Sequence, residues 1–166
     1  TGLNYIFAAL LLAGGLAVAI ACLYRADRRR GFFPLLAVLL LAMPALSRAS
    51  TMLEFFFLWE LITVSSYFLI LQGKDAAPHA LRFLLFSLSA AFFLLVGFAA
   101  SYAVSGSADL SALRTAGSDN SLAFVLLAIG LLIKAGAIGV HVWLPGAYAQ
   151  TDDDMSAMLS AARAMR

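Results

Sequence analysis

The chain has 166 residues, of which 63% belong to the apolar set AVILMFWYC, and its mean hydropathy is +0.95. Its 11 basic and 9 acidic side chains give a formal net charge of +2. Soluble domains average about 45–50% apolar and about 25% charged residues, so this chain has more apolar surface than a globule of its size can bury. The composition excludes an ordinary soluble domain and places the surplus surface in lipid.

Charged residues divide the sequence into five apolar segments, each close to the roughly 20 residues that a transmembrane helix needs. Helices are predicted because a lone strand cannot satisfy its backbone in lipid, and barrel strands would alternate over about ten residues. The second segment is the least regular, since Pro34 and Pro44 lie near its ends. The prediction is an all-α, polytopic transmembrane helix bundle that forms one membrane module over residues 1–166. Its spans are 3–24, 32–50, 52–71, 80–104 and 122–140.

The distribution of basic residues predicts the orientation of these spans, because short cytoplasmic loops collect Lys and Arg. Six basic residues fall on one side of the predicted bundle and two on the other. We therefore expect the former side to be cytoplasmic and Thr1 to be external. The six are Arg25, Arg28, Arg29, Arg30, Lys74 and Arg82, and the two are Arg48 and Arg114.

Several classes of function lack their residue patterns in this sequence. The single cysteine, Cys22, excludes a disulfide framework and a paired-thiol metal site. The two histidines, His79 and His141, have no partners at helical spacing, so no metal site is expected. The basic cluster after the first span has no interleaved aromatics, so a nucleic-acid partner is not expected. With no phosphate loop or nucleophile elbow either, we expect no cofactor and no bond-making catalysis in this chain.

Two charged residues lie deep inside predicted spans, far from the span ends. Glu60 is roughly 12 Å and Lys134 roughly 18 Å from the same outer end at the helical rise per residue. An ionisable group at such depth costs about 2.5 to 3.5 kcal/mol on insertion scales, and it usually marks a functional site. Thr63 and Tyr67 follow Glu60 at i+3 and i+7, which makes one polar face. We predict that Glu60 and Lys134 face each other in the interior of the bundle.

The sequence after Lys134 predicts a broken helix. Glycine in a span either permits close packing or weakens the helix, and proline stops regular helix. His141 lies seven residues after the lysine, on the same face if the helix continues. We predict a proton path through Glu60, Lys134 and His141, followed by an interrupted cytoplasmic-side segment over residues 141–161. The residues predicted to break the helix are Gly136, Gly139 and Pro145.

A proton path is not the simplest role for these residues. Glu60 and Lys134 could form a static buried ion pair that only fixes helix packing, which is the alternative of a structural membrane subunit. Such pairs are poor sources of net stability, which favours the transport reading. The aromatic run Phe55–Phe57 with Trp59 is interpreted as a lipid-facing interface belt.

Two stretches of the sequence resemble the proton-translocating antiporter-like family. They are FFFLWELITVSSYFLI (Phe55 to Ile70) and KAGAIGVHVWLPGAYA (Lys134 to Ala149), with Ser156 to Ser160 after them. The family includes the antiporter-like subunits of complex I, Mrp-type antiporter subunits and the membrane subunits of group 4 hydrogenases. The resemblance implies that Glu60 and Lys134 are a coupled titratable pair in a proton path, with His141 near the continuing relay.

The resemblance also carries expectations about context. It implies a first-half fragment, truncated or separately encoded, of a longer subunit whose partners are other membrane subunits and the lipid bilayer. It implies a multi-pass protein of a bacterial or archaeal cytoplasmic membrane. Such a chain would be a non-catalytic subunit of a respiratory, hydrogenase-type or Mrp-type complex. The sequence departs from the family pattern after the Leu-Pro step, where Gly146 to Tyr148 and Asp152 to Asp154 stand.

Overall fold

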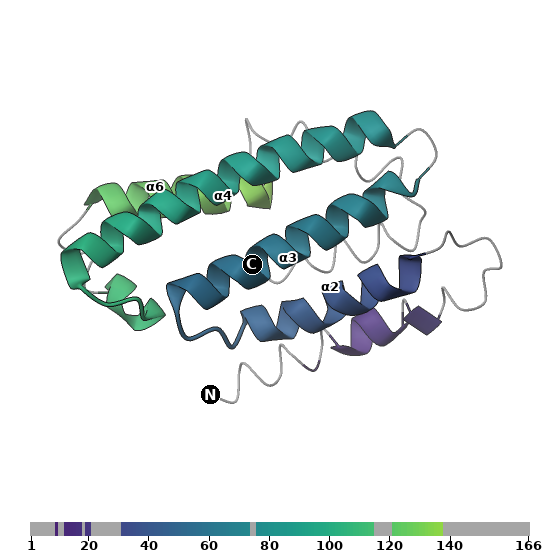
Figure 1. The fold of residues 1–166 in the computed structure, drawn as a ribbon, viewed down its shortest axis with the longest axis horizontal. Coiled ribbons are helices and arrows are strands. Elements are labelled where there is room, and N and C mark those ends of the chain that lie inside the picture. Colours follow the sequence, from purple (N-terminus) through teal and green to yellow (C-terminus); the bar gives the residue numbers. More distant parts are fainter. Residues whose placement is uncertain are drawn as a thin grey trace.

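The computed structural model describes residues 31–73, 76–114 and 121–137, together with residues 9, 12–17 and 19–20. Its helices are α2 (Phe32–Leu46), α3 (Met52–Leu71), α4 (Ala77–Ser105) and α6 (Ser121–Ala135), with a 3-10 turn η1 (Leu110–Ala112). The helices lie alongside one another (Figure 1), with α2 packed on α3, α3 on α4 and α4 on α6. In the part of the chain described, the all-α prediction is confirmed.

Among the described residues, two helices are long and apolar enough to cross a membrane. They are α3, with 20 residues, and α4, with 29, whereas α2 and α6 are apolar but have 15 residues each. The predicted span 52–71 coincides with α3, and the span 80–104 lies within α4. Most of the predicted first span and the whole segment 141–161 lie outside the described residues. The structure therefore supports a helical membrane bundle without fixing the predicted number of spans.

The span predicted over residues 32–50 is too long at its C-terminal end. The helix stops at Leu46, and the amides of Arg48 and Ala49 turn back to the carbonyls of Ala45 and Leu46. Pro44 lies in the last turn and has no N–H to donate to the preceding turn. The chain then becomes extended at Thr51, with φ −113° and ψ 156°.

A cap and a backbone bridge hold the start of α3. The hydroxyl of Thr51 accepts a hydrogen bond from the amide of Glu54 at 3.1 Å, and the Glu54 carboxylate accepts from the amide of Ser50 at 2.9 Å. This reciprocal arrangement resembles a capping box. Thr51 also forms an isolated antiparallel bridge with Asp109 in the connector after α4. The two connectors that carry Arg48 and Arg114 are therefore joined at one end of the bundle.

The outward face of α3 is apolar. Phe57, at the middle of this face, is 71% exposed. An apolar stripe of this length along one helix is typical of a surface that contacts lipid or a neighbouring protein. The stripe consists of Leu53, Phe57, Leu61, Val64 and Phe68, all of which are exposed.

Glycines bring α4 and α6 close together. A Cβ atom built on Gly130 of α6 would lie 2.9 Å from the carbonyl oxygen of Ala90, which belongs to the backbone of α4. A Cβ atom on Gly97 of α4 would lie 2.8 Å from the Leu127 side chain. Small residues allow this kind of backbone approach between membrane helices. The α4–α6 contact positions the last turn of α6, which carries Lys134.

Candidate functional site

Lys134 is buried where three helices meet. Its side chain is 7% exposed, and its Nζ donates hydrogen bonds to Thr63 Oγ1 at 2.5 Å and to Ser87 Oγ at 3.0 Å. Thr63 belongs to α3 and Ser87 to α4, and both side chains are buried. A buried ammonium group is stable only when oxygen acceptors replace the water that it has lost. The two hydroxyls provide acceptors from two different helices.

Each of these two helices also presents an aromatic ring one turn before its hydroxyl. Trp59 precedes Thr63 by four residues, and Phe83 precedes Ser87 by four, so each pair lies on one helix face. The Nζ of Lys134 lies 5.0 Å from the centroid of the Phe83 ring and 5.7 Å from that of Trp59. Ring faces attract cations within about 6 Å. The site therefore combines hydroxyl acceptors with two rings around one ammonium group.

The end of α6 follows directly after Lys134. The amide of Gly136 donates to the carbonyl of Ile133 at 3.1 Å, and the amide of Ala137 donates to that of Leu132 at 3.0 Å. This pair of bonds is a Schellman motif, and Gly136 has the φ of +63° that the motif needs. Lys134 thus lies in the last helical turn, where the helix dipole favours a positive charge. The span predicted to reach residue 140 extends beyond this helix end.

Glu60 lies near the lysine but is not paired with it directly. It precedes Thr63 by three residues on α3, is half-buried, and interacts electrostatically with Lys134. Its Oε1 atom is buried and has no hydrogen-bond partner in the part of the chain described. Within the described part of the chain, Glu60 and Lys134 form no ion pair with a nitrogen–oxygen distance of 4.0 Å or less.

The remaining predicted site residues divide between described and undescribed parts of the chain. Tyr67 is half-buried one turn after Thr63, and its ring contacts Phe68 with a centroid distance of 5.2 Å. Gly136 is buried at the end of α6. His141, Gly139 and Pro145 lie outside the described residues. The predicted step from Lys134 to His141 therefore stays a prediction.

The interpretation of the aromatic run as a lipid-facing belt is wrong for Trp59. Phe57 is exposed, but Trp59 is only 4% exposed, and its ring lies 5.6 Å from that of Phe55 inside the bundle. The helical period accounts for the difference, since residues 57 and 59 are separated by about 200° around the helix axis. Trp59 therefore belongs to the lysine site, and Phe57 to the outward face.

Sequence analysis did not identify Ser87 as a site residue. Its only signal was a pair of serines, Ser87 and Ser89, inside the apolar run of the fourth span. Ser89 is exposed and donates to the carbonyl of Leu85 in its own helix at 2.9 Å, whereas Ser87 faces the interior. Helical spacing separates the two faces, but the face that meets Lys134 depends on how α4 packs against α6.

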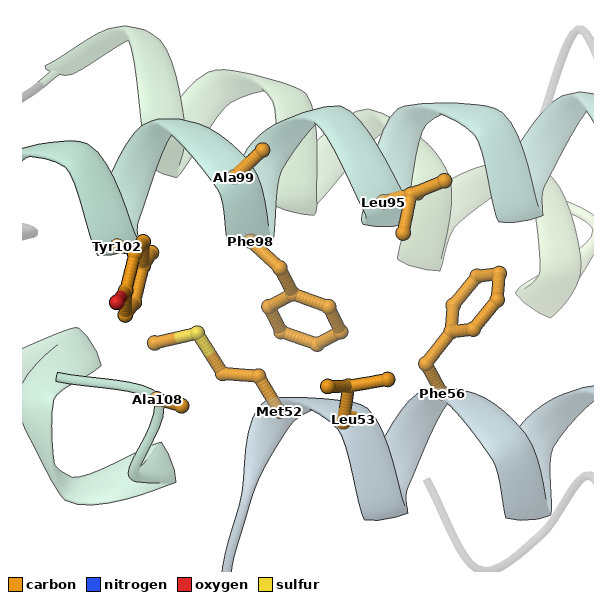
Figure 2. Close-up of a pocket in the computed structure, with 8 residues that line it drawn as sticks. All are labelled: Met52, Leu53, Phe56, Leu95, Phe98, Ala99, Tyr102 and Ala108. Carbon is orange, nitrogen blue, oxygen red and sulfur yellow. The ribbon is translucent and has the colours of Figure 1, made fainter.

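An apolar cavity that is open to the surface lies between the same two helices, α3 and α4, nearer to Thr51. Figure 2 shows this cavity of about 180 Å³, where side chains from the start of α3 and the end of α4 point toward one another. Ala108 of the following connector closes one side. Apart from Ala108, the lining consists of Met52, Leu53, Phe56, Leu95, Phe98, Ala99 and Tyr102.

Comparison with known proteins places these helices in a family. The model of the NADH:quinone oxidoreductase/Mrp antiporter transmembrane family matches residues 49–165, which include Glu60, Ser87 and Lys134. The chain belongs to this family. It is therefore an integral membrane protein related to the antiporter-like subunits of such complexes, as the sequence motifs indicated. The resemblance seen in the Trp-Glu and Lys-Ala-Gly motifs is confirmed.

Relatives in this family are subunits of bacterial NADH-quinone oxidoreductases. Subunit N from Desulforudis audaxviator is 34% identical over 173 residues, covering 90% of this chain and 34% of the relative. Subunit N from Trichlorobacter lovleyi is 29% identical over 165 residues, covering 91% of this chain and 34% of the relative. The chain thus spans about a third of the length of the curated relatives that it matches.

Solved structures share the fold of this family member. A chain of the membrane-bound sulfane sulfur reductase, an archaeal respiratory membrane complex, superposes with a TM-score of 0.85 at 23% identity. It is matched over 99% of this chain and 28% of its own length. A chain of the Mrp complex from Dietzia sp. DQ12-45-1b gives a TM-score of 0.79 at 25% identity, over 95% of this chain and 31% of that one.

Proposed function

We propose that this chain moves protons, or exchanges a cation for protons, as part of an antiporter-like subunit of a larger membrane complex. Its partners would be other membrane subunits of a respiratory, hydrogenase-type or Mrp-type complex in a bacterial or archaeal cytoplasmic membrane. The observation that carries the proposal is a buried lysine held by neutral hydroxyls, with a half-buried carboxylate in electrostatic reach but not bonded to it. Membership of the antiporter family supports the same function.

The proposed mechanism is charge switching between Glu60 and Lys134. When the carboxylate is ionised, it attracts the ammonium group, and when it is protonated, that attraction disappears. Movement of the ammonium group between the carboxylate and the hydroxyls changes how readily the lysine gives up its proton. A proton released there passes through water toward His141. No covalent chemistry is involved.

The test measures proton uptake into vesicles that contain the assembled complex, normalised to the amount of complex. Glu60→Gln, Lys134→Ala and the double variant are compared with wild type. A relay predicts at least a roughly tenfold loss of uptake in all three, with the double variant assembled normally because no lone buried charge remains. Glu54→Gln is the matched control, since Glu54 is an exposed carboxylate on the same helix. It is expected to pump as wild type does.

The alternative of a structural subunit predicts a different pattern. The lysine joins α3, α4 and α6, so it could serve packing alone. In that case each single variant would assemble poorly, because it leaves one buried charge without its counterpart, and the double variant would recover both assembly and uptake. Full proton uptake by the double variant would exclude the relay.

A further inference from the structure

We propose that Ser87 is a positioning residue that holds the Lys134 ammonium group in a position away from Glu60. The inference rests on the proposed function, because this second position matters only if the lysine moves between the hydroxyls and Glu60. Neither the family motifs nor the spacing of charges in the sequence identifies this serine.

The geometry of the two hydroxyls makes them acceptors for the lysine. Thr63 donates its own hydroxyl hydrogen to the carbonyl of Trp59 at 3.1 Å, which leaves the oxygen lone pairs for Lys134. The Ser87 oxygen lies 3.0 Å from Nζ, at an ordinary hydrogen-bond distance, and its side chain is buried. Because both acceptors are neutral, they stabilise the ammonium group without the stronger attraction of a counter-charge.

Ser87 and Thr63 lie on different helices, and Thr63 alone is on the same helix as Glu60. Thr63 and Glu60 lie on the same helix, three residues apart, so the position of the one relative to the other is fixed by α3. Ser87 lies on α4, which packs closely against α6 through Gly97 and Gly130. The Ser87 hydrogen bond therefore draws the ammonium group toward α4, whereas the Thr63 hydrogen bond draws it toward α3, the helix of the carboxylate.

The free oxygen of Glu60 fits this arrangement. Its Oε1 atom is buried and lacks a partner among the described residues, so it remains available to an ammonium group that leaves the hydroxyls. Removing the Ser87 hydroxyl removes an acceptor on α4 that competes with Glu60 for the Lys134 ammonium group. We expect the lysine then to stay on the α3 side, which slows each cycle of proton transfer.

Ser87→Ala tests the inference in the assembled complex, with proton uptake into vesicles as the readout. We expect uptake to fall about tenfold or more, the lower end of the range for losing one hydrogen bond to a charged group, with assembly unchanged. Ser87→Thr keeps the hydroxyl and should restore uptake to within about twofold, which a loss of packing alone would not predict. Ser101→Ala is the matched control. Ser101 is equally buried on α4, and its hydroxyl has no partner in the described part of the chain.

The outcomes separate this inference from the function on which it rests. Wild-type uptake by Ser87→Ala, together with loss of uptake in Lys134→Ala, would overturn the role of Ser87 and leave the relay intact. Wild-type uptake by Lys134→Ala would overturn both. If Ser87→Ala does not assemble, Ser87→Cys is compared with Ser87→Thr. The thiol is a weak acceptor, so equal uptake by the two would contradict the proposal.

Discussion

Helices α3 and α4 form two regions of opposite character. Around Lys134 they present the buried hydroxyls of Thr63 and Ser87, and toward the Thr51 end they line an apolar cavity, open to the surface, that includes Phe98 and Leu95. Both regions are built from the same two helices within one bundle. The hydroxyls at positions 63 and 87 are therefore one difference between the helix contact that holds a buried charge and the apolar one.

The comparison also shows why the lysine is where it is. The ammonium group has oxygen acceptors, two aromatic rings and the C-terminal end of α6 around it. At the cavity, Met52 and Phe98 offer no such acceptor. Tyr102 carries the one side-chain oxygen among the residues that line the cavity, so an ammonium group there would have one hydroxyl acceptor at most. Substitutions that place a charge in the cavity, or that disturb the packing around Lys134, test this difference between the two regions directly.

The largest effect is expected when a lysine is placed in the apolar cavity. Phe98→Lys would bury a charge at a cost of about 2.5 to 3.5 kcal/mol and would remove the edge-to-face contact with Phe55, whose centroid lies 6.0 Å away. We expect almost no assembled protein in the membrane, measured by immunoblot of purified membranes. Phe98→Met, which keeps an apolar side chain, should assemble. Normal assembly of Phe98→Lys would show that the two regions do not differ in their tolerance of charge.

A smaller effect is expected from widening the α4–α6 contact. Gly130→Ala places a methyl group 2.9 Å from the carbonyl oxygen of Ala90, so the helices must separate. Such overpacking costs about 1 to 3 kcal/mol, and the shift moves Lys134, one turn away, relative to Ser87. The measurement is the thermal unfolding midpoint in detergent, together with proton uptake.

The control for this variant is Gly14→Ala, where nothing lies within 4 Å of the added Cβ atom. We expect its midpoint to equal or slightly exceed that of wild type, because alanine favours a helix more than glycine does. Equal losses in the two variants would mean that the close approach of α4 and α6 has no special role in the lysine site.

The smallest effect is expected at the start of α3, beside the apolar cavity. Thr51→Ala removes the side-chain cap on the amide of Glu54 and should lower the free energy of unfolding by about 1 kcal/mol. Thr51→Ser keeps the hydroxyl and should lose little of it. Proton uptake per assembled complex should stay unchanged in both, because the cap lies about three turns from Thr63. A loss of uptake in Thr51→Ala, but not in Thr51→Ser, would show that the start of α3 affects proton transfer at the lysine site.

Much of the fold could be predicted because its signals are local. The limits of α3 follow from Thr51 before a continuous apolar run, and the run of α4 ends at Gly106, which adopts the left-handed φ of 66°. The end of α2 at Leu46 was not predicted, because Ser47 to Ser50 are compatible with a helix and the extended conformation there depends on contacts with the connector after α4.

Only part of the candidate site could be predicted, because some of its residues come together through packing between helices. Glu60 and Lys134 are conspicuous as charges inside apolar runs, and Thr63 shares a helix face with Glu60. Ser87 and Trp59 gain their roles from packing between helices that are far apart in the sequence. A single sequence gives the face of each helix but not the rotation that brings one face against another.

The Thr51–Asp109 bridge has a mechanical consequence for the lysine site. The backbone amide of Met52 donates to Ala108 at 2.8 Å and that of Leu110 donates to Ser50 at 2.9 Å, so the start of α3 is fastened to the connector after α4. Thr63 lies about 18 Å farther along the helix, so α3 can act as a lever whose fulcrum is this bridge. A tilt of about 10° would displace Thr63 by about 3 Å, the length of one hydrogen bond. A force that tilted α3 by this amount would therefore make or break a contact with Lys134.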